Sequence, residues 1–396
     1  MRVLFLTDSL SDFDGVGRYT IRLIQALEKQ VPGLEVEVLL ARKHRPTSSE
    51  VPSHWDVSVA LPPDSFFYMS PLRFWISLLL ATWRVRRAAK RADVVHAIKD
   101  YPHNLVGYLG AWLAGKPCVA TAHGTYTVQP ILSKRHGRLS RWLYPRFAHM
   151  ISVSRYTRKR VLELMGKDLS EERISVIPNK VNAAHYADAR EVGTKPWHSQ
   201  RFTLGIGEVK ERKGHHLSLA AWCRIAPEQP DLHHYIVGKS SEGDEYRQSL
   251  EQLARDAGVF DRVHFLGNIT EDEKVDLLQR AEVFVHTPVT ASDGGFEGFG
   301  IVYLEASASG TPCLGTLDCG AEDAIEDGSS GLLSAQDVPS VEAALRKLLD
   351  PTSGAELRKR MGEAGKTLAQ RTTWDENAAR VLEIYRGAIG PKASTS

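Results

Sequence analysis

The segment whose residue types most clearly indicate a chemical function is Gly-rich and holds two carboxylates eight residues apart. It runs GGFEGFGIVYLEASASGTPCLGT and contains Glu297 and Glu305. A helix that begins after these glycines would put Glu297 before its N-terminus and Glu305 inside it, where a carboxylate among Ala and Ser is costly without a partner. Glu297 would contact a ligand at the helix N-terminus, and Glu305 would accept hydrogen bonds from hydroxyl groups. The amides from Phe299 to Val302 could bind phosphate.

A second segment, FTLGIGEVKERKGHH, combines a Gly-containing turn with two cations. Gly205 and Gly207 follow a strand-like run, and Arg212 and Lys213 precede a predicted helix. Two cations at a helix N-terminus favour a diphosphate, because their charges add to the positive end of the helix dipole. The alternative, a solvated basic turn, stays open.

His123 lies in CVATAHGTY, directly after an apolar run and before Gly124. Open α/β sheets bind ligands at the carboxyl ends of their strands. The position therefore favours a ligand-contacting histidine over a structural one.

The first strand leads into TDSLSDFDGVGRY, where Gly15 and Gly17 open a predicted helix. These glycines could allow the helix N-terminus to bind an anion, or they could only form a tight turn. The third glycine of a dinucleotide fingerprint is missing, which disfavours NAD. Asp12 and Asp14 have a spacing that can hold a divalent cation, but we favour turn formation and helix capping, and we predict no metal site.

The elements that must position these groups are short apolar strands alternating with amphipathic helices in both halves of the chain. This pattern predicts an α/β protein with parallel, doubly wound sheets. The predicted strands of the first half are 2–6, 36–40, 57–61, 94–97, 118–122, 150–153 and 174–177, and those of the second are 202–207, 234–237, 263–266, 283–286 and 312–315.

The passage 183–200 lacks periodicity and contains Gly193 and Pro196, so we predict the linker there. The expected domains are 1–188 and 198–370, and the helix 374–389 is expected to complete the first.

Composition and charge exclude several classes of protein. The chain is 42% hydrophobic and 25% charged, which is typical of a soluble globular protein, and its four cysteines have neither zinc nor disulfide spacing. This cysteine usage fits a reducing compartment, so we expect a cytoplasmic protein. The start, MRVLFLTDSL, lacks the features of a secretory signal and is interpreted as a first strand. Residues 1–190 hold 28 basic and 16 acidic residues, a charge of +12, whereas the remainder carries −10. The basic half should face an anionic partner, although no nucleic-acid module accompanies it.

The sequence resembles a known family, the retaining nucleotide-sugar glycosyltransferases of family 4, which have the GT-B fold. The E-x7-E element of that family matches Glu297 and Glu305. Further matching segments extend over nearly the whole chain: DGVGRY, AHGT, ISVSRYTRKRV, SVIPNKVN, RKG, HFLGNIT and EDGSSGLL. The resemblance implies two Rossmann-like domains facing each other across a cleft, with the last helix crossing back to the first domain.

The resemblance also implies roles for individual residues. Lys213 would bind the donor diphosphate, Glu297 the transferred sugar and Glu305 the nucleotide ribose. His123 would face the sugar from the first domain, and Gly15 and Gly17 would lie near phosphate and acceptor. The donor site would be completed by Arg212, Gly298, Phe299, Gly300 and Ile301.

Two departures from the family pattern stand out. Glu208 occupies a position where many members carry an arginine, so one diphosphate cation is missing, for which Arg212 or Lys210 could substitute. This change would mark a subfamily or weaken donor binding. The first domain ends in Pro-Asn-Lys-Val-Asn, at 178–182, in place of Pro-Asn-Gly-Val-Asp, which changes a turn only.

The expected function is retaining transfer of a sugar from a nucleoside diphosphate donor to a hydroxyl acceptor, a saccharide or a lipid-linked saccharide, without metal or cofactor. The resemblance implies front-face attack, with Glu297 as a positioning group. The alternatives are a sugar-nucleotide epimerase of the same architecture and a catalytically weak nucleotide-sugar-binding protein.

One segment raises the question of membrane contact. The uncharged run 74–83 is too short to span a bilayer and leads into Arg84, Arg86, Arg87, Lys90 and Arg91. An apolar stretch with a cationic end suits peripheral contact with an anionic leaflet. The alternative is a crossover helix buried against the sheet, with a solvated basic end.

Overall fold

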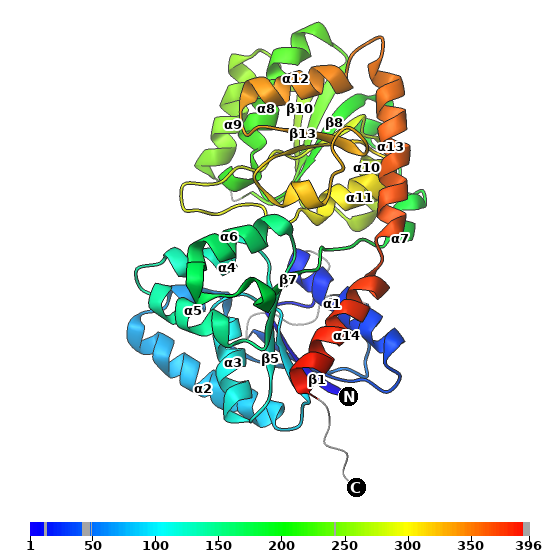
Figure 1. Ribbon diagram of the computed structural model, residues 1–396. Coiled ribbons are helices and arrows are strands. Elements are labelled where there is room, and N and C mark those ends of the chain that lie inside the picture. The colour runs from blue at the N-terminus through cyan, green and yellow to red at the C-terminus, as the bar shows by residue number, and fades with distance from the viewer. Residues whose placement is uncertain (12–13, 42–47, 49, 241–242, 391–396) are drawn as a thin grey trace. The chain divides into compact units, whose positions relative to one another are not determined.

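The computed structural model describes residues 1–11, 14–41, 48, 50–240 and 243–390. The chain divides into two compact units (Figure 1). The first comprises Met1–Asn179 and Trp374–Ser396, and the second comprises Lys180–Thr373. The domain limits expected from the sequence, 188 and 198, both lie inside the second unit.

The first unit contains a seven-stranded parallel sheet of order β3-β2-β1-β4-β5-β6-β7. Its strands are β1 (Arg2–Thr7), β2 (Glu35–Ala41), β3 (Asp56–Leu61), β4 (Val94–Ala97), β5 (Cys118–Ala122), β6 (His149–Ser152) and β7 (Ile174–Val176). The order reverses between β1 and β4, and this switch point is where open α/β sheets bind ligands.

The helices of this unit follow from local signals in the sequence. They are α1 (Gly15–Gln30), α2 (Pro71–Ala89), α3 (His103–Leu113), α4 (Thr125–Leu132), α5 (Gly137–Leu143), α6 (Arg155–Met165) and α14 (Trp374–Ile389). Asp14 caps α1 by accepting a hydrogen bond from the Gly17 amide at 2.6 Å, which is the capping role favoured for it. Asp12, its partner in the acidic pair, lies outside the described residues.

The last helix, α14, belongs to the first unit although it follows the second in sequence. It packs beside α1, and Asn377 Nδ2 donates to the Pro178 carbonyl at 2.7 Å. Inside the unit, Tyr385 Oη lies 2.6 Å from His96 Nδ1 on β4. The helix is thus bonded to the first sheet and to the end of the first stretch of chain.

The second unit contains a six-stranded parallel sheet of order β10-β9-β8-β11-β12-β13. Its strands are β8 (Arg201–Ile206), β9 (Leu232–Val237), β10 (Val263–Gly267), β11 (Val283–Val285), β12 (Cys313–Thr316) and β13 (Gly331–Ser334). Its helices are α7 (Ala183–Ala187), α8 (His215–Ile225), α9 (Glu245–Asp256), α10 (Glu271–Arg280), α11 (Ile301–Ser309), α12 (Val338–Leu348) and α13 (Gly354–Arg371).

The parallel α/β architecture is confirmed, with two differences in the second unit. The sixth strand, β13, was not predicted, because its four residues, GLLS, are too short for a periodic signal. Part of the predicted linker forms α7, which packs against α11. A five-residue helix has too few turns to reveal an apolar stripe.

Helix α2 has two apolar faces. Phe74, Leu78 and Val85 are buried against the unit, whereas a second stripe faces outward. The outward stripe consists of Leu72, Trp75, Ile76, Leu79, Leu80 and Trp83. Within the described ranges, no helix combines the length and apolarity needed to cross a bilayer.

Candidate donor-binding site and its relatives

The cationic turn after β8 is held in place by backbone packing. A short 3-10 helix, Glu211–Lys213, precedes Gly214, which adopts a left-handed conformation with φ of 68°. A Cβ at Gly214 would lie 1.6 Å from the Thr287 carbonyl oxygen, so only glycine fits this close approach. The fit brings Arg212 and Lys213 beside the chain that leaves β11.

Glu297 is the charge that these cations face. Its side chain forms an ion pair with Lys213 Nζ, and Arg212 Nη1 lies 3.9 Å from its Oε2 atom. His286 Nε2 approaches the same oxygen to 3.4 Å. The residue as a whole is 8% exposed. Three nitrogen-bearing side chains therefore surround one nearly buried carboxylate.

The protonation states in this cluster follow from its charges. Burial raises the pKa of the Glu297 carboxyl, but Lys213, His286 and Arg212 outweigh burial and hold that pKa well below its ordinary value. Burial lowers the pKa of His286, which stays neutral near pH 7. Glu297 is therefore an ionised acceptor at neutral pH and has no proton to donate.

Glu208, the unusual acidic residue of this turn, is neutralised locally. Its Oε2 atom lies 3.0 Å from Lys210 Nζ. Burial raises the pKa of Glu208, but Lys210 and the nearby Arg212 and Lys213 lower it overall. Lys210 is therefore paired with Glu208, whereas Arg212 lies near Glu297.

The loop after Glu297 leads into the N-terminus of α11, which no side chain caps. Gly300 takes a left-handed conformation with φ of 79°, and a Cβ there would lie 2.6 Å from the Tyr303 ring. Phe299 is 3% exposed. A Cβ at Gly300 would also lie 3.6 Å from Glu297 Cγ. The first turn of α11, at Ile301, therefore begins close to Glu297, and its backbone amides form the positive end of the helix dipole there.

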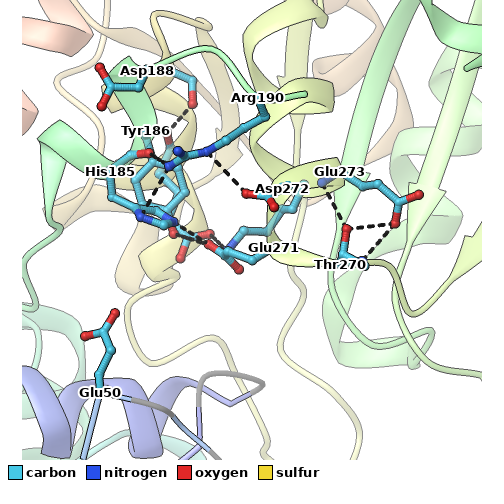
Figure 2. A network of polar contacts seen from close by, with 12 residues as sticks. Glu50, His185, Tyr186, Asp188, Arg190, Thr270, Glu271, Asp272 and Glu273 are labelled. Carbon is cyan, nitrogen blue, oxygen red and sulfur yellow. Dashed lines mark hydrogen bonds and ion pairs between the residues drawn. The ribbon is translucent and has the colours of Figure 1, made fainter. Parts of the chain in front are cut away.

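Glu305 lies inside α11 and is 1% exposed. Lys274 Nζ, from α10, is 3.1 Å from Glu305 Oε2 and 2.9 Å from Glu271 Oε1. Glu271 in turn contacts His185 and Tyr186 of α7, and Figure 2 shows this polar network, with these three residues labelled. Both carboxylates of the spaced pair thus have a lysine partner.

In the first unit, His123 follows β5 as predicted and its backbone amide donates to Asp100 Oδ1 at 3.2 Å. The Tyr19 ring meets the imidazole edge-on at a centroid distance of 5.0 Å. Burial lowers the pKa of His123 to about 4, with a further contribution from Lys99. Among the described residues, the buried Nε2 atom has no hydrogen-bond partner. A neutral imidazole with an unused nitrogen is suited to contact a hydroxyl.

The other groups at this edge of the first sheet are Asp8 and Lys99, which form an ion pair after β1 and β4. Gly15 begins α1, and the amide of Gly17 is already taken by Asp14, so an anion at this helix would meet the earlier amides. A pocket of about 410 Å³ lies nearby in the same unit. Its lining includes Phe67, Tyr68, Lys99, Tyr101, Tyr126 and Gln129.

The structure brings Arg212, Lys213 and Glu297 together, with the α11 N-terminus nearby. Within the portion of the chain described, no three His, Cys, Asp or Glu side chains are grouped to hold a metal ion. Sequence reasoning missed His286 and Lys274. His286 follows β11 as His123 follows β5, so the same strand-end signal could have found it. Lys274 gave no comparable signal.

Comparison with known proteins defines the class. The family model of glycosyl transferases group 1 matches residues 193–368, and that of glycosyltransferase family 4 matches residues 13–185. The Anabaena protein HepE, crystallised with UDP and glucose, superposes with a TM-score of 0.76 over 97% of this chain and 98% of its own, at 20% identity. The glycosyltransferase WaaG gives 0.71 over 97% and 100%, at 17% identity. The fold is that of the GT-B glycosyltransferases.

Sequence relatives narrow the assignment. The chain is 30% identical to the phosphatidyl-myo-inositol mannosyltransferase of Mycolicibacterium smegmatis over 75% of this chain and 72% of that protein. It is 28% identical to the glycogen synthase of Mycobacterium tuberculosis over 94% of this chain and 91% of that protein. The chain belongs to glycosyltransferase family 4.

Proposed function

We propose that this glycosyltransferase moves a sugar from a nucleoside diphosphate donor to a hydroxyl acceptor with retention of configuration. The observation that carries the proposal is the cluster of Lys213, Arg212 and ionised Glu297 beside the uncapped N-terminus of α11. It offers positive potential for a diphosphate and a carboxylate for sugar hydroxyls within one small volume. HepE, crystallised with UDP and glucose, supports a nucleotide-sugar donor.

The reaction needs stabilisation of the departing diphosphate. Lys213, Arg212 and the first amides of α11 supply it without reorganisation, because they are already fixed by Glu297 and by Gly214. In a front-face reaction, the bond from the anomeric carbon to the phosphate oxygen breaks as the acceptor oxygen bonds to that carbon on the same face. The acceptor proton passes to the departing phosphate oxygen, so Glu297 serves as a positioning group.

We propose that this reaction requires no metal ion. Two cationic side chains and a helix N-terminus can offset the charge of a diphosphate. Activity should therefore be unchanged after treatment with EDTA. Loss of activity that Mg²⁺ or Mn²⁺ restores would contradict the proposal.

The acceptor is proposed to bind the first unit. His123 offers an unused nitrogen, and the pocket beside Lys99 has aromatic walls suited to a sugar or polyol ring with a few polar groups. The relatives include both a glycogen synthase and mannosyltransferases that act on phosphatidyl-myo-inositol or its mannoside. A saccharide or a lipid-linked saccharide suits this pocket.

The test is calorimetric titration of UDP-, GDP- and ADP-sugars into wild type, Glu297→Gln and Lys213→Met. One donor should bind wild type, and Lys213→Met should weaken that binding at least tenfold. A ligand at a hundred times its Kd should also add about 2.7 kcal/mol to stability. Glu228→Gln is the matched control, because Glu228 is ion-paired with Arg346 on the surface of the same unit.

The chemical outcome then separates the alternatives. With an accepted hydroxyl acceptor, proton NMR of the product should show the anomeric configuration of the donor. Conversion of the donor without any acceptor would favour an epimerase. Failure of every donor to bind would leave only a weak binding protein and would overturn the proposed transfer.

We further propose that the outward stripe of α2 rests on an anionic membrane surface. Six large apolar residues, each between 49% and 71% exposed, recur along one face from Leu72 to Trp83. Their three- and four-residue spacing is that of one helical stripe. Contiguous apolar surface of this kind is rare on a soluble protein without a partner.

The positive charge of the segment that contains the stripe favours an anionic partner. Residues 65–162 contain 17 Lys and Arg but only two acidic residues, Asp93 and Asp100. Arg86 and Arg87 each lie over the Trp83 ring, at 4.9 and 5.4 Å from its centroid. Apolar and cationic groups side by side match the interface of a bilayer that contains anionic lipid.

Flotation with vesicles tests this contact. Wild type should float with phosphatidylcholine vesicles that contain about 30 mol% phosphatidylglycerol, because an anionic surface attracts basic segments, and should float less with phosphatidylcholine alone. The triple variant Leu72→Ser, Leu79→Ser, Trp83→Ser should remain at the bottom, whereas Phe260→Ser, in the other unit, should float. Wild type that stays at the bottom with anionic vesicles would overturn the membrane proposal.

A further inference from the structure

The pocket of the first unit and the outward stripe of α2 meet at one short stretch of chain. One wall of the pocket is the 3-10 helix Asp64–Tyr68, which supplies three of the lining residues. Helix α2 begins at Pro71, and the stripe begins at Leu72, four residues after Tyr68. Four residues span at most about 14 Å even when fully extended. The pocket wall and the first residue of the stripe are therefore close together.

Aromatic packing fixes this wall of the pocket against α2. The ring of Phe66, in the wall, is stacked on that of Phe74, in the first turn of α2, at a centroid distance of 4.8 Å. The His136 ring lies 4.6 Å from that of Phe67 and 5.1 Å from that of Phe74. Because these rings pack on one another, the pocket wall and the start of the stripe keep a fixed spacing.

The pocket combines polar lining groups with apolar groups that reach the surface. Lys99 and Gln129 are among its polar lining residues. Two aromatic lining residues, Tyr68 and Tyr126, are 73% and 50% exposed, and Leu132, at the end of the same helix as Tyr126, is also 50% exposed. Aromatic walls with a few polar groups suit a hydroxyl-rich ring, whereas clustered exposed apolar side chains suit a hydrocarbon chain.

A cation lies at the same junction between the pocket and the stripe. Arg135 Nη1 donates to the Met69 carbonyl at 2.5 Å, and its guanidinium lies 5.5 Å from the centroid of the Phe74 ring. Lys134, the residue before it, is exposed, as is Arg135 itself. Apolar, aromatic and cationic groups therefore occur together here, which matches the interfacial region of a leaflet with anionic lipid.

We propose that the acceptor is a membrane lipid with a hydroxyl-rich head group, which enters this pocket while its hydrocarbon chain stays in the leaflet against the Leu72 end of the stripe. This inference rests on the proposed function, in which the pocket takes the acceptor and the stripe rests on a membrane. A soluble saccharide would fit the pocket but would gain nothing from the stripe. The protein therefore selects its acceptor by the chain as well as by the head group.

A matched pair of small probes measures the gain from the chain. Octyl glucoside and methyl glucoside share one head group and differ only in the length of the alkyl chain. Each buried methylene strengthens binding roughly fourfold, so partial burial of the chain should make octyl glucoside bind at least about tenfold more tightly. Titrations followed by saturation-transfer NMR, with octyl glucoside kept below its micelle-forming concentration, give both affinities. Equal affinities, or no binding of either probe, would overturn the inference.

Variants of the stripe locate the chain. The double variant Leu72→Ser, Ile76→Ser changes the end next to the pocket, and its preference for octyl glucoside should fall below about threefold, because the chain loses its apolar contacts. Trp83 lies about 17 Å further along the helix, where an octyl chain held at the pocket does not reach. Trp83→Ser should therefore keep the full preference while it still weakens flotation with anionic vesicles.

Leu113→Ser is the matched control. Leu113 is also apolar and exposed and belongs to the same unit, but it is part of neither the pocket nor the stripe. All these side chains are exposed, so their substitution leaves the core of the unit intact. A preference that falls equally in Leu113→Ser, or that persists in Leu72→Ser, Ile76→Ser, would overturn the inference.

A variant of the pocket locates the head group. Ser65 lines the pocket and is exposed, so Ser65→Trp should fold and fill part of the cavity. Both glucosides should then lose their binding, because the shared head group no longer enters. Binding at full affinity to Ser65→Trp would place the head group outside this pocket and overturn the inference.

The probes also separate this inference from the proposed transfer, because their binding needs no donor. If no nucleotide sugar binds wild type, the proposed transfer fails, and the glucosides then report only whether pocket and stripe act together. If a donor binds, octyl glucoside should be the better acceptor, with kcat/KM at least about tenfold above that of methyl glucoside. Transfer to both with the same kcat/KM would overturn the inference and leave the proposed transfer standing.

Discussion

Lys213 and Glu297 form an ion pair that joins the turn after β8 to the loop before α11, 84 residues further along the chain. Both side chains are largely shielded from solvent, with exposed fractions of 15% and 11%. The lysine expected to bind the donor diphosphate is thus already positioned by the carboxylate expected to contact the transferred sugar.

This pairing predicts that Glu297→Gln damages catalysis more than donor binding. The amide keeps the shape but cannot offset the charge of Lys213 or accept as strongly from sugar hydroxyls. We expect kcat to fall at least about a hundredfold, a size typical for loss of a preorganised charged group, while donor Kd changes less than about fivefold. Initial rates and calorimetry measure the two quantities, and equal losses in both would contradict the positioning role.

The packing of Gly214 predicts that adding a single methyl group at this position greatly lowers the stability of the protein. Gly214→Ala should destabilise the protein by about 3 kcal/mol or more, because it adds a clash with the Thr287 carbonyl to the strain of a left-handed residue. Gly258 has the same φ of 68°, but a Cβ there would meet no atom within 4 Å, so Gly258→Ala should cost only about 1 to 2 kcal/mol. Urea denaturation of the two variants compares them, and equal losses would exclude the clash.

The buried imidazole of His96 leads us to expect that the free energy of unfolding decreases in mild acid. Burial lowers the pKa of His96 to about 3, with a further contribution from His123, against an ordinary value of 6.5. Between these values the unfolded chain binds a proton that the folded protein does not, so stability falls as the pH drops below 6.5. At pH 5 this one residue should contribute a loss of about 2 kcal/mol.

Denaturant titrations at pH 7 and pH 5 check this prediction. His96→Asn also loses the contacts of the ring with Tyr385 and Thr121, so its stability at pH 7 will be lower. The informative quantity is the difference between the two pH values, which should be smaller in the variant. A difference as large as that of wild type would assign the acid sensitivity to other residues.

The four cysteines should react only after unfolding. All are buried as free thiols, and burial raises the pKa of Cys223 to about 11 and those of Cys313 and Cys319 to about 12. Burial also raises the pKa of Cys118. Since the thiolate is the reactive form, Ellman's reagent at pH 8 should detect almost no thiol in the native protein and four in denaturant. A rapid native signal would reveal an accessible cysteine.

The architecture could be predicted because it rests on local patterns. Alternating apolar strands and amphipathic helices indicated two parallel α/β sheets, and all but one of the strands lie at or within a residue or two of their predicted places. Strand ends followed by glycine also indicated His123 and the turn at Lys213. The strand β13 was missed because four residues give no period.

The ion pairs of Lys213 with Glu297 and of Lys274 with Glu305 could not be predicted, because each joins residues distant in sequence. Glu208 suggested a missing diphosphate cation, but only the structure showed that Lys210 neutralises it. Lys274 carries no signal in the sequence, and only the packing of α10 against α11 places it beside Glu305.

The sequence by itself determined the order of the elements, the family and the segments that supply the site, since these depend on residue type and spacing along one stretch of chain. Tertiary structure decided which charges meet and which apolar residues stay outside. Helix α2 illustrates this division, because apolar residues occupy two of its faces and the sequence could not tell which face packs. Phe74 is buried against the rings of Phe66 and His136 and Leu79 is left exposed, because burial depends on contacts between distant segments.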